Sequence, residues 1–349
     1  MSLRGCARPL SEAYDVGLLD LDGTVYIGSR ALPGVEEALD KARASGMRLA
    51  FVTNNASRTP SAVASLLSDI GVPAAAEDVV TSAQAAARLL ADRLPPGARV
   101  LVVGGMGLRQ ALRAQGLRPV STAAERPAAV AQGYTPDLSY SLIAEGAQAV
   151  AGGAFFVGSN GDRTVSGGRG RQPRPGNGSL LRVIATATGI DPIVTGKPEQ
   201  PLHQEAVLRT GARRPLVIGD RLDTDIEGAR RGGADSLLVL TGVTGAPELV
   251  TAPASRRPTY VAADLAGLLT PHPEVRHDDH VYECGGWRAA WAADVGHIDL
   301  SGHGDPIDGL RALCAAAWHA DDPIAMESVA AALERLEGGL GCGREDGTD

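Results

Sequence analysis

Two aspartates close the first apolar run of the sequence. Asp20 and Asp22 occupy alternate positions at the end of the apolar run 16–21, and Gly23 follows directly. Because side chains alternate in direction along a strand, both carboxylates point to the same side. Carboxylates this close repel each other unless a cation lies between them, and a hard divalent ion with oxygen ligands fits. The pattern predicts a metal site at the end of a strand; a solvated acidic loop is the alternative.

A second acidic stretch follows the apolar run of residues 215–219. Asp220, Asp223 and Asp225 come close together where a strand gives way to a helix. A helix N-cap explains one of the three, and Asp225 is our candidate for it, but capping does not explain all of them. We therefore expect this stretch to supply the remaining metal ligands.

Groups suited to phosphate appear at two other places. Thr53, Asn54 and Asn55 end a buried apolar run, and ligands of open α/β sheets bind outside the carboxyl ends of the strands. The Thr53 hydroxyl and the N–H groups after it suit a phosphate oxygen, although a plain turn is equally compatible. Only two of the 33 basic residues are lysines, and Lys197 is the second. A compact ammonium suits one phosphoryl oxygen, against the alternative of a solvent-facing side chain.

Short apolar strands that alternate with helices must position these residues. This order predicts an α/β fold, a doubly wound parallel sheet with helices on both faces. The Gly-, Pro- and Arg-rich residues 161–178 predict a long surface loop. We expect strands at 16–21, 47–52, 99–103, 128–132, 154–158, 215–219 and 236–240, and helices at 33–45, 60–70, 108–115, 139–150, 199–210 and 226–232.

The composition changes after residue 271. All three tryptophans and six of the seven histidines lie beyond residue 270. We expect two strands within 281–300 and helices at 308–319 and 328–337, in a small α+β domain without which the rest folds. This tail packs on the core, mediates a homodimer, or is the relic of an acyltransferase-like module; the sequence leaves the three open. Its histidines and Cys284 match no zinc spacing, so a polar linker is preferred to a metal site.

Composition limits the class of protein. Apolar residues make up 44% of the chain and charged residues 21%, as in globular proteins. The net charge of −8 disfavours nucleic acid and anionic lipid as partners. No apolar run is long enough to span a membrane, the N-terminus has no signal region, and the four cysteines form no CxxC pair. We expect a cytoplasmic protein.

Taken in order, the four motifs resemble those of the haloacid dehalogenase superfamily. Asp20-x-Asp22-Gly-Thr, a strand ending in Thr53, the distant Lys197 and Gly-Asp220-x-x-x-x-Asp225 match its pattern over residues 15 to 270. The acidic, Ala- and Arg-rich composition and the C-terminal extension resemble actinobacterial members. The finer resemblance is to subclass IIA phosphatases, although Ser159 stands where that subclass usually has Thr; the matching motifs are Val52-Thr53-Asn54-Asn55, Pro175-Gly176-Asn177-Gly178 and Gly196-Lys197-Pro198. It implies a Rossmann-like core at 11–82 and 190–271, an inserted α/β cap domain at 83–189 and a C-terminal extension at 275–349.

The resemblance implies phosphoryl transfer through an aspartyl-phosphate. Asp20 would be the nucleophile, and Asp22 would protonate the leaving alcohol and then deprotonate water. Mg²⁺ would be held by a carboxylate oxygen of Asp20, the backbone carbonyl of Asp22 and the carboxylate of Asp220. The remaining roles are phosphate binding by Thr53, the amide of Asn54 and Lys197, orientation of Lys197 or a metal-bound water by Asp225, and support by Gly23 and Asn55.

In this subclass the cap covers the site and selects the leaving group. Asn160 and Asp162 are our candidates for substrate contacts. The arginines after them would suit a second anionic group, but a solvated Arg-rich loop is preferred; they are Arg163, Arg169, Arg171 and Arg174. The substrate is a small phosphoester, with glycerol 3-phosphate as the first candidate and phosphoglycolate, sugar phosphates, nucleotides and pyridoxal phosphate as alternatives.

Two other classes of function fit the sequence less well. Residues 100–107 form a strand with a Gly-rich turn, as in dinucleotide-binding proteins, but Gln110 replaces the third glycine and Glu125 does not clearly end a strand. A non-catalytic sensor of phosphorylated ligands would lack the nucleophile or the acid, and both Asp20 and Asp22 are present.

Overall fold

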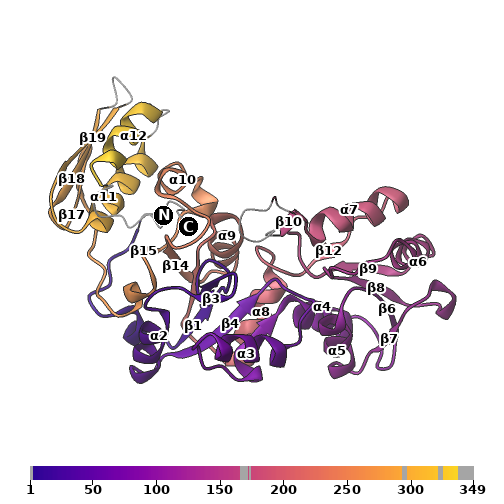
Figure 1. Cartoon of the computed structure of the whole chain (residues 1–349). Helices are drawn as coiled ribbons and strands as arrows, with labels where there is room; N and C mark the ends of the chain where they lie inside the picture. The colour runs from indigo at the N-terminus through magenta and orange to yellow at the C-terminus, as the bar shows by residue number, and fades with distance from the viewer. Residues whose placement is uncertain (1–2, 166–171, 173, 293–296, 321–324, 337–349) are drawn as a thin grey trace, which may run out of the picture. The chain divides into compact units, whose positions relative to one another are not determined.

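The computed structural model describes residues 3–165, 172, 174–292, 297–320 and 325–336. The chain divides into two compact units (Figure 1). Unit one comprises residues 1–49 and 212–349, and unit two comprises residues 50–211. Strand β4 (Arg48–Thr53) carries the chain from the first unit into the second.

Unit one is built on parallel strands in the order β15-β14-β13-β1. Near-continuous apolar runs make these strands, as expected where both faces are covered. Val16 pairs with Pro215 and Leu19 with Ile218, which brings the carboxyl ends of β1 and β13 to one edge. The strands are β1 (Val16–Leu19), β13 (Pro215–Gly219), β14 (Asp235–Val239) and β15 (Tyr260–Ala262), with the hairpin β2 (Tyr26–Ile27) and β3 (Arg30–Ala31). The helices are α1 (Leu10–Ala13), α2 (Val35–Ala44), α9 (Glu227–Arg231) and α10 (Ala246–Val250).

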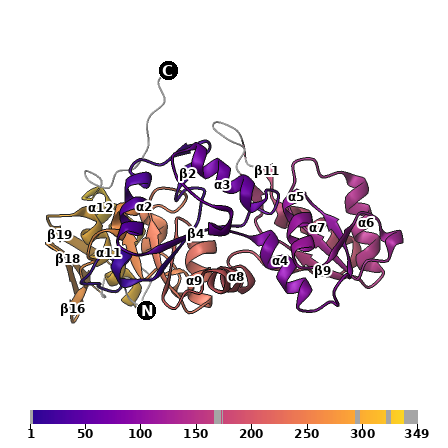
Figure 2. The ribbon, with the colours of Figure 1, turned by 90° about the horizontal axis from the view of Figure 1, so that it is seen from below.

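A four-stranded antiparallel sheet and two helices follow in the same unit. Figures 1 and 2 both show α11 and α12 beside this sheet. Its members are β16 (Arg276–Asp278), β17 (Val281–Cys284), β18 (Trp287–Ala292), β19 (His297–Gly302), α11 (Pro306–His319) and α12 (Met326–Glu334). The sequence predicted two strands within 281–300, where the structure has three, because the tight turn at Gly285 separates β17 from β18.

This C-terminal module shares one apolar cluster with the parallel sheet. Trp287, Leu310 and Leu313 of the module belong to the same buried cluster as Leu249 and Val261. The interior is therefore continuous from the parallel sheet into the module, and the expectation that the rest folds without the module has no support in the packing.

Unit two contains a five-stranded parallel sheet in the order β12-β9-β8-β6-β7. Helices α4 and α5 cover one face and α6 and α7 the other (Figure 1). Residues of β6 alternate between these layers, since Val100 and Val102 face α4 and α5 while Leu101 and Val103 face α6 and α7. The strands are β6 (Arg99–Val103), β7 (Arg118–Val120), β8 (Ala129–Gln132), β9 (Phe155–Gly158) and β12 (Ile193–Val194). The helices are α4 (Ser82–Ala91), α5 (Met106–Ala114), α6 (Tyr140–Ala151) and α7 (Asn177–Thr188).

The rest of unit two leads into and out of this sheet. Strand β4 pairs in parallel with β5 (Val79–Thr81), and α3 (Pro60–Asp69) lies between them in sequence. The predicted loop at 161–178 contains the short hairpin of β10 (Thr164–Val165) and β11 (Arg174–Pro175), and α8 (Gln200–Thr210) closes the unit. The predicted α/β class with parallel sheets and a small C-terminal extension is confirmed. Within the described ranges, no helix is both long and apolar enough to cross a membrane.

Candidate active site

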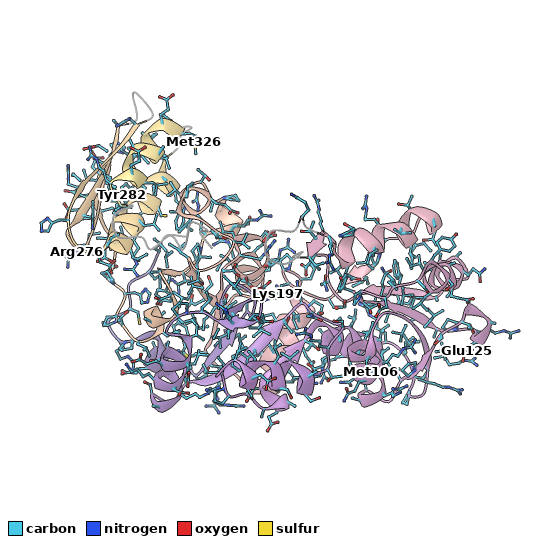
Figure 3. The ribbon with its side chains drawn as sticks, viewed as in Figure 1. Met106, Glu125, Lys197, Arg276, Tyr282 and Met326 are labelled. Atoms are coloured by element: carbon cyan, nitrogen blue, oxygen red, sulfur yellow. The ribbon has the colours of Figure 1, made fainter. Side chains whose placement is uncertain are left out.

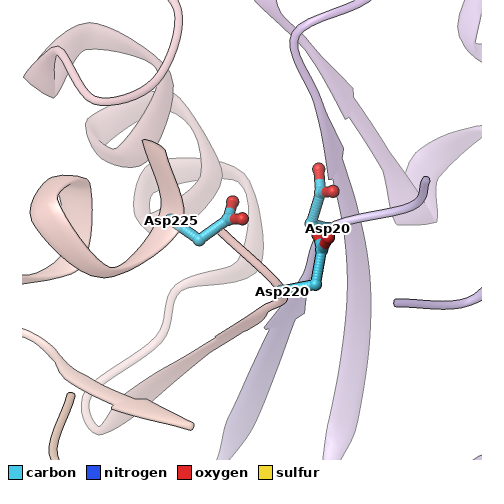
Figure 4. Close-up of side chains that lie close together, drawn as sticks. All are labelled: Asp20, Asp220 and Asp225. Atoms are coloured by element: carbon cyan, nitrogen blue, oxygen red, sulfur yellow. The ribbon is translucent and has the colours of Figure 1, made fainter. Parts of the chain in front are cut away.

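Three carboxylates meet at the carboxyl edge of the parallel strands of unit one. One oxygen atom from each of Asp20, Asp220 and Asp225 lies within 4.8 Å of the other two (Figure 4). Asp20 follows β1 and Asp220 follows β13, and the strand pairing continues to Asp20, whose N–H donates to the Ile218 carbonyl over 2.8 Å. Adjacent parallel strands thus bring together residues that are far apart in sequence.

A loop after β14 orients Asp220, whose side chain is fully buried. The N–H of Val243 donates to Oδ2 of Asp220 over 2.7 Å, and the N–H of Thr244 donates to the Asp220 carbonyl over 3.2 Å. A Cβ atom at Gly242 would lie 2.0 Å from this Oδ2, and one at Gly23, which has φ +89°, would lie 2.4 Å from it. Both glycines let the backbone close around the carboxylate.

The same loop also holds the chain after Asp22. The hydroxyl of Thr241 donates to the carbonyl of Gly23 over 2.6 Å. Residues 241–244 are not among the residues predicted from the sequence to form the site. The available signal was the pair of glycines, Gly242 and Gly245, directly after a buried strand at the edge where the acids gather.

Asp225 lies in a π-helical turn, Leu222–Ile226, that precedes α9. Its carboxylate approaches the end of β13, where a Cβ atom at Gly219 would lie 2.3 Å from Cγ of Asp225. The residue that caps α9 is Ile226, so the prediction of an N-cap role for Asp225 is wrong. The turn directs this side chain to the acidic cluster, whereas Asp223 pairs with Arg221 over 2.9 Å.

The carboxylate of Asp22 is not part of this cluster. Among the described residues the cluster comprises Asp20, Asp220 and Asp225, whereas the spacing in sequence predicted a cation between the carboxylates of Asp20 and Asp22. The family resemblance assigns Asp22 only a backbone carbonyl as a metal ligand, and that role stays a prediction. Loss of surrounding water raises the pKa of the Asp22 carboxyl, and the charge of Arg221 partly opposes that rise. A raised pKa keeps a proton available for donation closer to neutral pH.

The acidic cluster has the chemistry of a divalent-cation site. Asp220 and Asp225 are both buried, so their negative charges are poorly screened and repel each other and Asp20. All the donors are oxygen atoms, which hard cations such as Mg²⁺ prefer. Since glycine at positions 23, 219 and 242 leaves the carboxylates room to converge, the residues fit Mg²⁺.

In unit two, Lys197 and the end of β4 are held together by hydrogen bonds. Lys197 lies after β12 and is labelled in Figure 3. Its Nζ donates to the carbonyl of Val52 over 3.1 Å, and its backbone N–H donates to Oδ1 of Asn54 over 2.8 Å. Oγ1 of Thr53 accepts the N–H of Asn55 over 3.1 Å. The predicted phosphate-binding residues are therefore neighbours within this unit.

Asn55 shapes the turn that follows. Its Oδ1 accepts the N–H of Ser57 over 2.9 Å and the Ser57 hydroxyl over 2.8 Å. An Asx turn of this kind fixes the backbone after Thr53. The supporting role of Asn55 in the site stays a prediction.

The two residues predicted to contact substrate lie on the loop after β9. Asn160 is buried, with Nδ2 donating to the Asn54 carbonyl over 2.7 Å and Oδ1 accepting the N–H of Asp162 over 3.2 Å. Asp162 accepts hydrogen bonds from Nδ2 of Asn54 over 3.1 and 3.3 Å. Contact of either residue with substrate stays a prediction. Arg169 and Arg171 lie outside the described residues.

The structure explains two sequence features that had suggested other functions, the Gly-rich turn of residues 100–107 and the histidines of the tail. The glycines after β6 meet the chain itself, since a Cβ atom at Gly107 would lie 2.3 Å from the Arg58 carbonyl oxygen and one at Gly104 would lie 2.9 Å from that of Gly133. In the tail, His277 and His319 stack with Tyr282. In the described part of the chain, the three aspartates are the only group of three or more acidic, histidine or cysteine side chains placed to hold a metal.

Comparisons with known proteins find a hydrolase family over two segments of the chain. A haloacid dehalogenase-like hydrolase model matches residues 17–118, a related HAD-hydrolase-like model matches 194–268, and a GCN5-related N-acetyltransferase like domain matches 284–338. The chain is 44% identical to a D-glycerol 3-phosphate phosphatase of Mycobacterium tuberculosis, over 90% of this chain and 88% of that protein. It is 38% identical to a 5′-nucleotidase of Bacillus subtilis, over 67% and 90%.

A solved structure is similar over nearly the whole chain. The crystal structure of a glycerol phosphate phosphatase from Mycobacterium tuberculosis in complex with magnesium has a TM-score of 0.84 and 42% identity, covering 94% of this chain and 99% of that one. The match therefore extends beyond the two hydrolase segments into the C-terminal module.

Proposed function

We propose that this chain, which belongs to the haloacid dehalogenase-like hydrolases as a phosphatase of subclass IIA, hydrolyses glycerol 3-phosphate with Mg²⁺ bound at Asp20, Asp220 and Asp225. The observation that carries the proposal is the convergence of these three carboxylates within 4.8 Å at the edge where β1 and β13 end. Such a cluster suits a divalent cation, and Asp20, the proposed nucleophile, would lie beside that cation.

The chemistry divides into two displacements at phosphorus. In the first, a carboxylate oxygen of Asp20 forms a bond to phosphorus as the bond to the substrate oxygen breaks, and Asp22 gives its proton to the departing alkoxide. In the second, Asp22 takes a proton from water, whose oxygen attacks the same phosphorus. Inorganic phosphate leaves, and Asp20 returns as a free carboxylate.

The remaining residues bind charge that the phosphoryl group carries throughout. Lys197 and the Thr53 turn supply an ammonium, a hydroxyl and backbone N–H groups for its oxygen atoms. When bound, Mg²⁺ offsets the repulsion between the Asp20 carboxylate and the phosphate dianion and stabilises charge in the transition state. Asp220 and Asp225 would hold it with Asp20, with the backbone carbonyl of Asp22 as a further ligand.

The substrate assignment is supported by the extent of similarity. The relative named for D-glycerol 3-phosphate matches 90% of this chain, whereas the nucleotidase matches 67%. Nucleoside monophosphates are the second candidate, since that nucleotidase is still 38% identical. We further propose that the enzyme is cytoplasmic and forms a homodimer. The proposed domains are a core at 11–82 and 190–271, a cap inserted at 83–189 and an extension at 275–349.

Phosphate release from a panel of small phosphoesters tests the function. With Mg²⁺, glycerol 3-phosphate should be the best substrate, and EDTA should abolish release. Asp20→Asn should lower the rate by at least about 10³-fold. Preference for a nucleotide would replace the substrate but keep the mechanism, and metal-independent release would contradict the proposed site.

A further inference from the structure

The side-chain amide of Asn54 pairs with the peptide of Lys197 on both of its edges. Oδ1 of Asn54 accepts the Lys197 N–H over 2.8 Å, and Nδ2 donates to the Lys197 carbonyl over 3.2 Å. This arrangement imitates the pairing of two backbone strands, although the residues are 143 positions apart. It fixes the backbone of Lys197 while Nζ is drawn to the carbonyl of Val52 over 3.1 Å.

The same Nδ2 group also reaches the loop after β9. It donates to both carboxylate oxygens of Asp162, over 3.1 and 3.3 Å. One amide group therefore serves two loops, and its orientation is determined, because only the nitrogen can donate to a carbonyl and a carboxylate.

The backbone of Asn54 is tied to that loop as well. Its carbonyl accepts Nδ2 of Asn160 over 2.7 Å and the hydroxyl of Ser82 over 2.6 Å. The carbonyl of Asn160 in turn accepts Nδ2 of Asn177, the first residue of α7, over 2.8 Å. A Cβ atom at Gly196 would lie 2.6 Å from Oδ1 of Asn54, so glycine is needed for this close approach.

We propose that Asn54 is a positioning residue whose side chain sets Lys197 against the Thr53 turn and couples both to the loop of Asn160 and Asp162. This inference rests on the proposed function, since it gives Lys197 and Thr53 their task. Asn160 acts through the same network, because both ends of its side chain are engaged within the chain. Its role is then positioning, in place of the substrate contact expected from sequence.

An aspartate at position 54 cannot replace the asparagine, although its shape is the same. It keeps the acceptor for the Lys197 N–H but loses the donor, so a carboxylate oxygen would face the Lys197 carbonyl and both oxygens of Asp162. Asp162→Asn supplies a new amide donor at that place. The pair of substitutions exchanges the donor and the acceptor and restores one contact.

A double-mutant cycle tests the proposal, with kcat and KM for glycerol 3-phosphate and p-nitrophenyl phosphate, and the melting temperature, measured for each variant. Asn54→Asp should lower kcat/KM by about 10- to 100-fold, mainly through kcat, because phosphoryl contacts strengthen in the transition state. Asn54→Asp with Asp162→Asn should recover at least about 5-fold over Asn54→Asp alone. Gln148→Glu, an equal charge change at an exposed position of α6, should match the wild type.

Three outcomes would overturn the inference. The first is a kcat/KM of Asn54→Asp equal to that of the wild type. The second is a double variant whose fold-change in kcat/KM equals the product of the two single fold-changes. The third is a loss of activity across the variants that is explained by their lower melting temperatures alone. If Asn54→Asp does not fold, Asn54→Ser and Asp162→Ala complete the same cycle, and multiplying effects again contradict it. Wild-type enzyme inactive on both esters would instead refute the proposed function, which separates the two failures.

Discussion

The N–H of Val243 donates to Oδ2 of Asp220 over 2.7 Å and so fixes a fully buried carboxylate from a loop more than twenty residues away. Residues that orient a ligand in this way commonly change metal affinity by about 10- to 100-fold when they are altered. The loop of residues 241–244 therefore belongs to the proposed metal site although it offers no acidic side chain.

Gly242→Ala tests this loop. The added methyl group would lie 2.0 Å from Oδ2 of Asp220, so the carboxylate or the loop must move. The Mg²⁺ concentration for half-maximal activity should rise by about 10-fold or more. Gly245→Ala is the matched control, since its Cβ atom would meet Cδ of Pro247 at an ordinary 3.5 Å. Equal metal titrations for the two variants would remove the loop from the site.

Arg311 is expected to be the main polar anchor of the C-terminal module. Its buried guanidinium donates to the carbonyl of Val261 and to Nδ1 of His272 and pairs with Asp308. Arg311→Met leaves Asp308 without this ion pair, which should cost about 3 kcal/mol of stability and lower the melting temperature. Lys41→Met, which breaks an exposed pair with Glu37, should change little. Equal melting temperatures for Arg311→Met and Lys41→Met would contradict this role of Arg311.

Deletion of residues 275–349 should leave an insoluble chain. The module covers Leu249 and Val261 in a shared apolar cluster, and its removal would expose them to water. Solubility and circular dichroism of the truncated protein measure this. A soluble, folded and active fragment would show that the module is a dispensable appendage, as the sequence suggested.

His272 should make unit one less stable in mild acid. Burial lowers the pKa of its ring, which donates to the carbonyl of Gly267 and accepts from Arg311 as a neutral imidazole; Asp308 and Tyr260 also face it. The unfolded chain therefore binds a proton near pH 6.5 that the folded chain does not, and stability falls as pH drops below that value.

His272→Gln removes this titration. Between pH 7.5 and pH 5.5 its melting temperature should fall less than that of the wild type, even if it starts lower. Parallel pH curves for the two proteins would exclude His272 as the source of the dependence.

The sequence predicted the parts of the site that are local. Asp20 and Asp220 each follow an apolar run directly, and parallel strands place such residues at one edge, so their meeting was foreseeable. The alternation of short strands and helices likewise indicated the α/β class. Both predictions follow from short stretches of sequence and from the regular geometry of parallel strands.

What could not be predicted depends on contacts between distant segments. The two hydrogen bonds between the Asn54 side chain and the Lys197 peptide join residues 143 positions apart. The sequence does not indicate which peptide a side-chain amide will contact. Asp225 looked like a helix cap because helical periodicity does not distinguish a π-turn from the first turn of an α-helix. A helix at 308–319 was predicted, but its packing in one apolar cluster with Leu249 and Val261 was not.

The most direct test of the account is to look for phosphate on Asp20 itself. Asp22→Asn should slow hydrolysis of the intermediate, because it removes the group that deprotonates water. With p-nitrophenyl phosphate, whose leaving group needs no proton from Asp22, the intermediate should still form, accumulate during turnover and be trapped by an acid quench. Mass spectrometry of the digested protein should then find one phosphoryl group on the peptide that contains Asp20, absent from Asp20→Asn. Turnover of p-nitrophenyl phosphate by Asp22→Asn without any such peptide, or with the group on another residue, would contradict the mechanism.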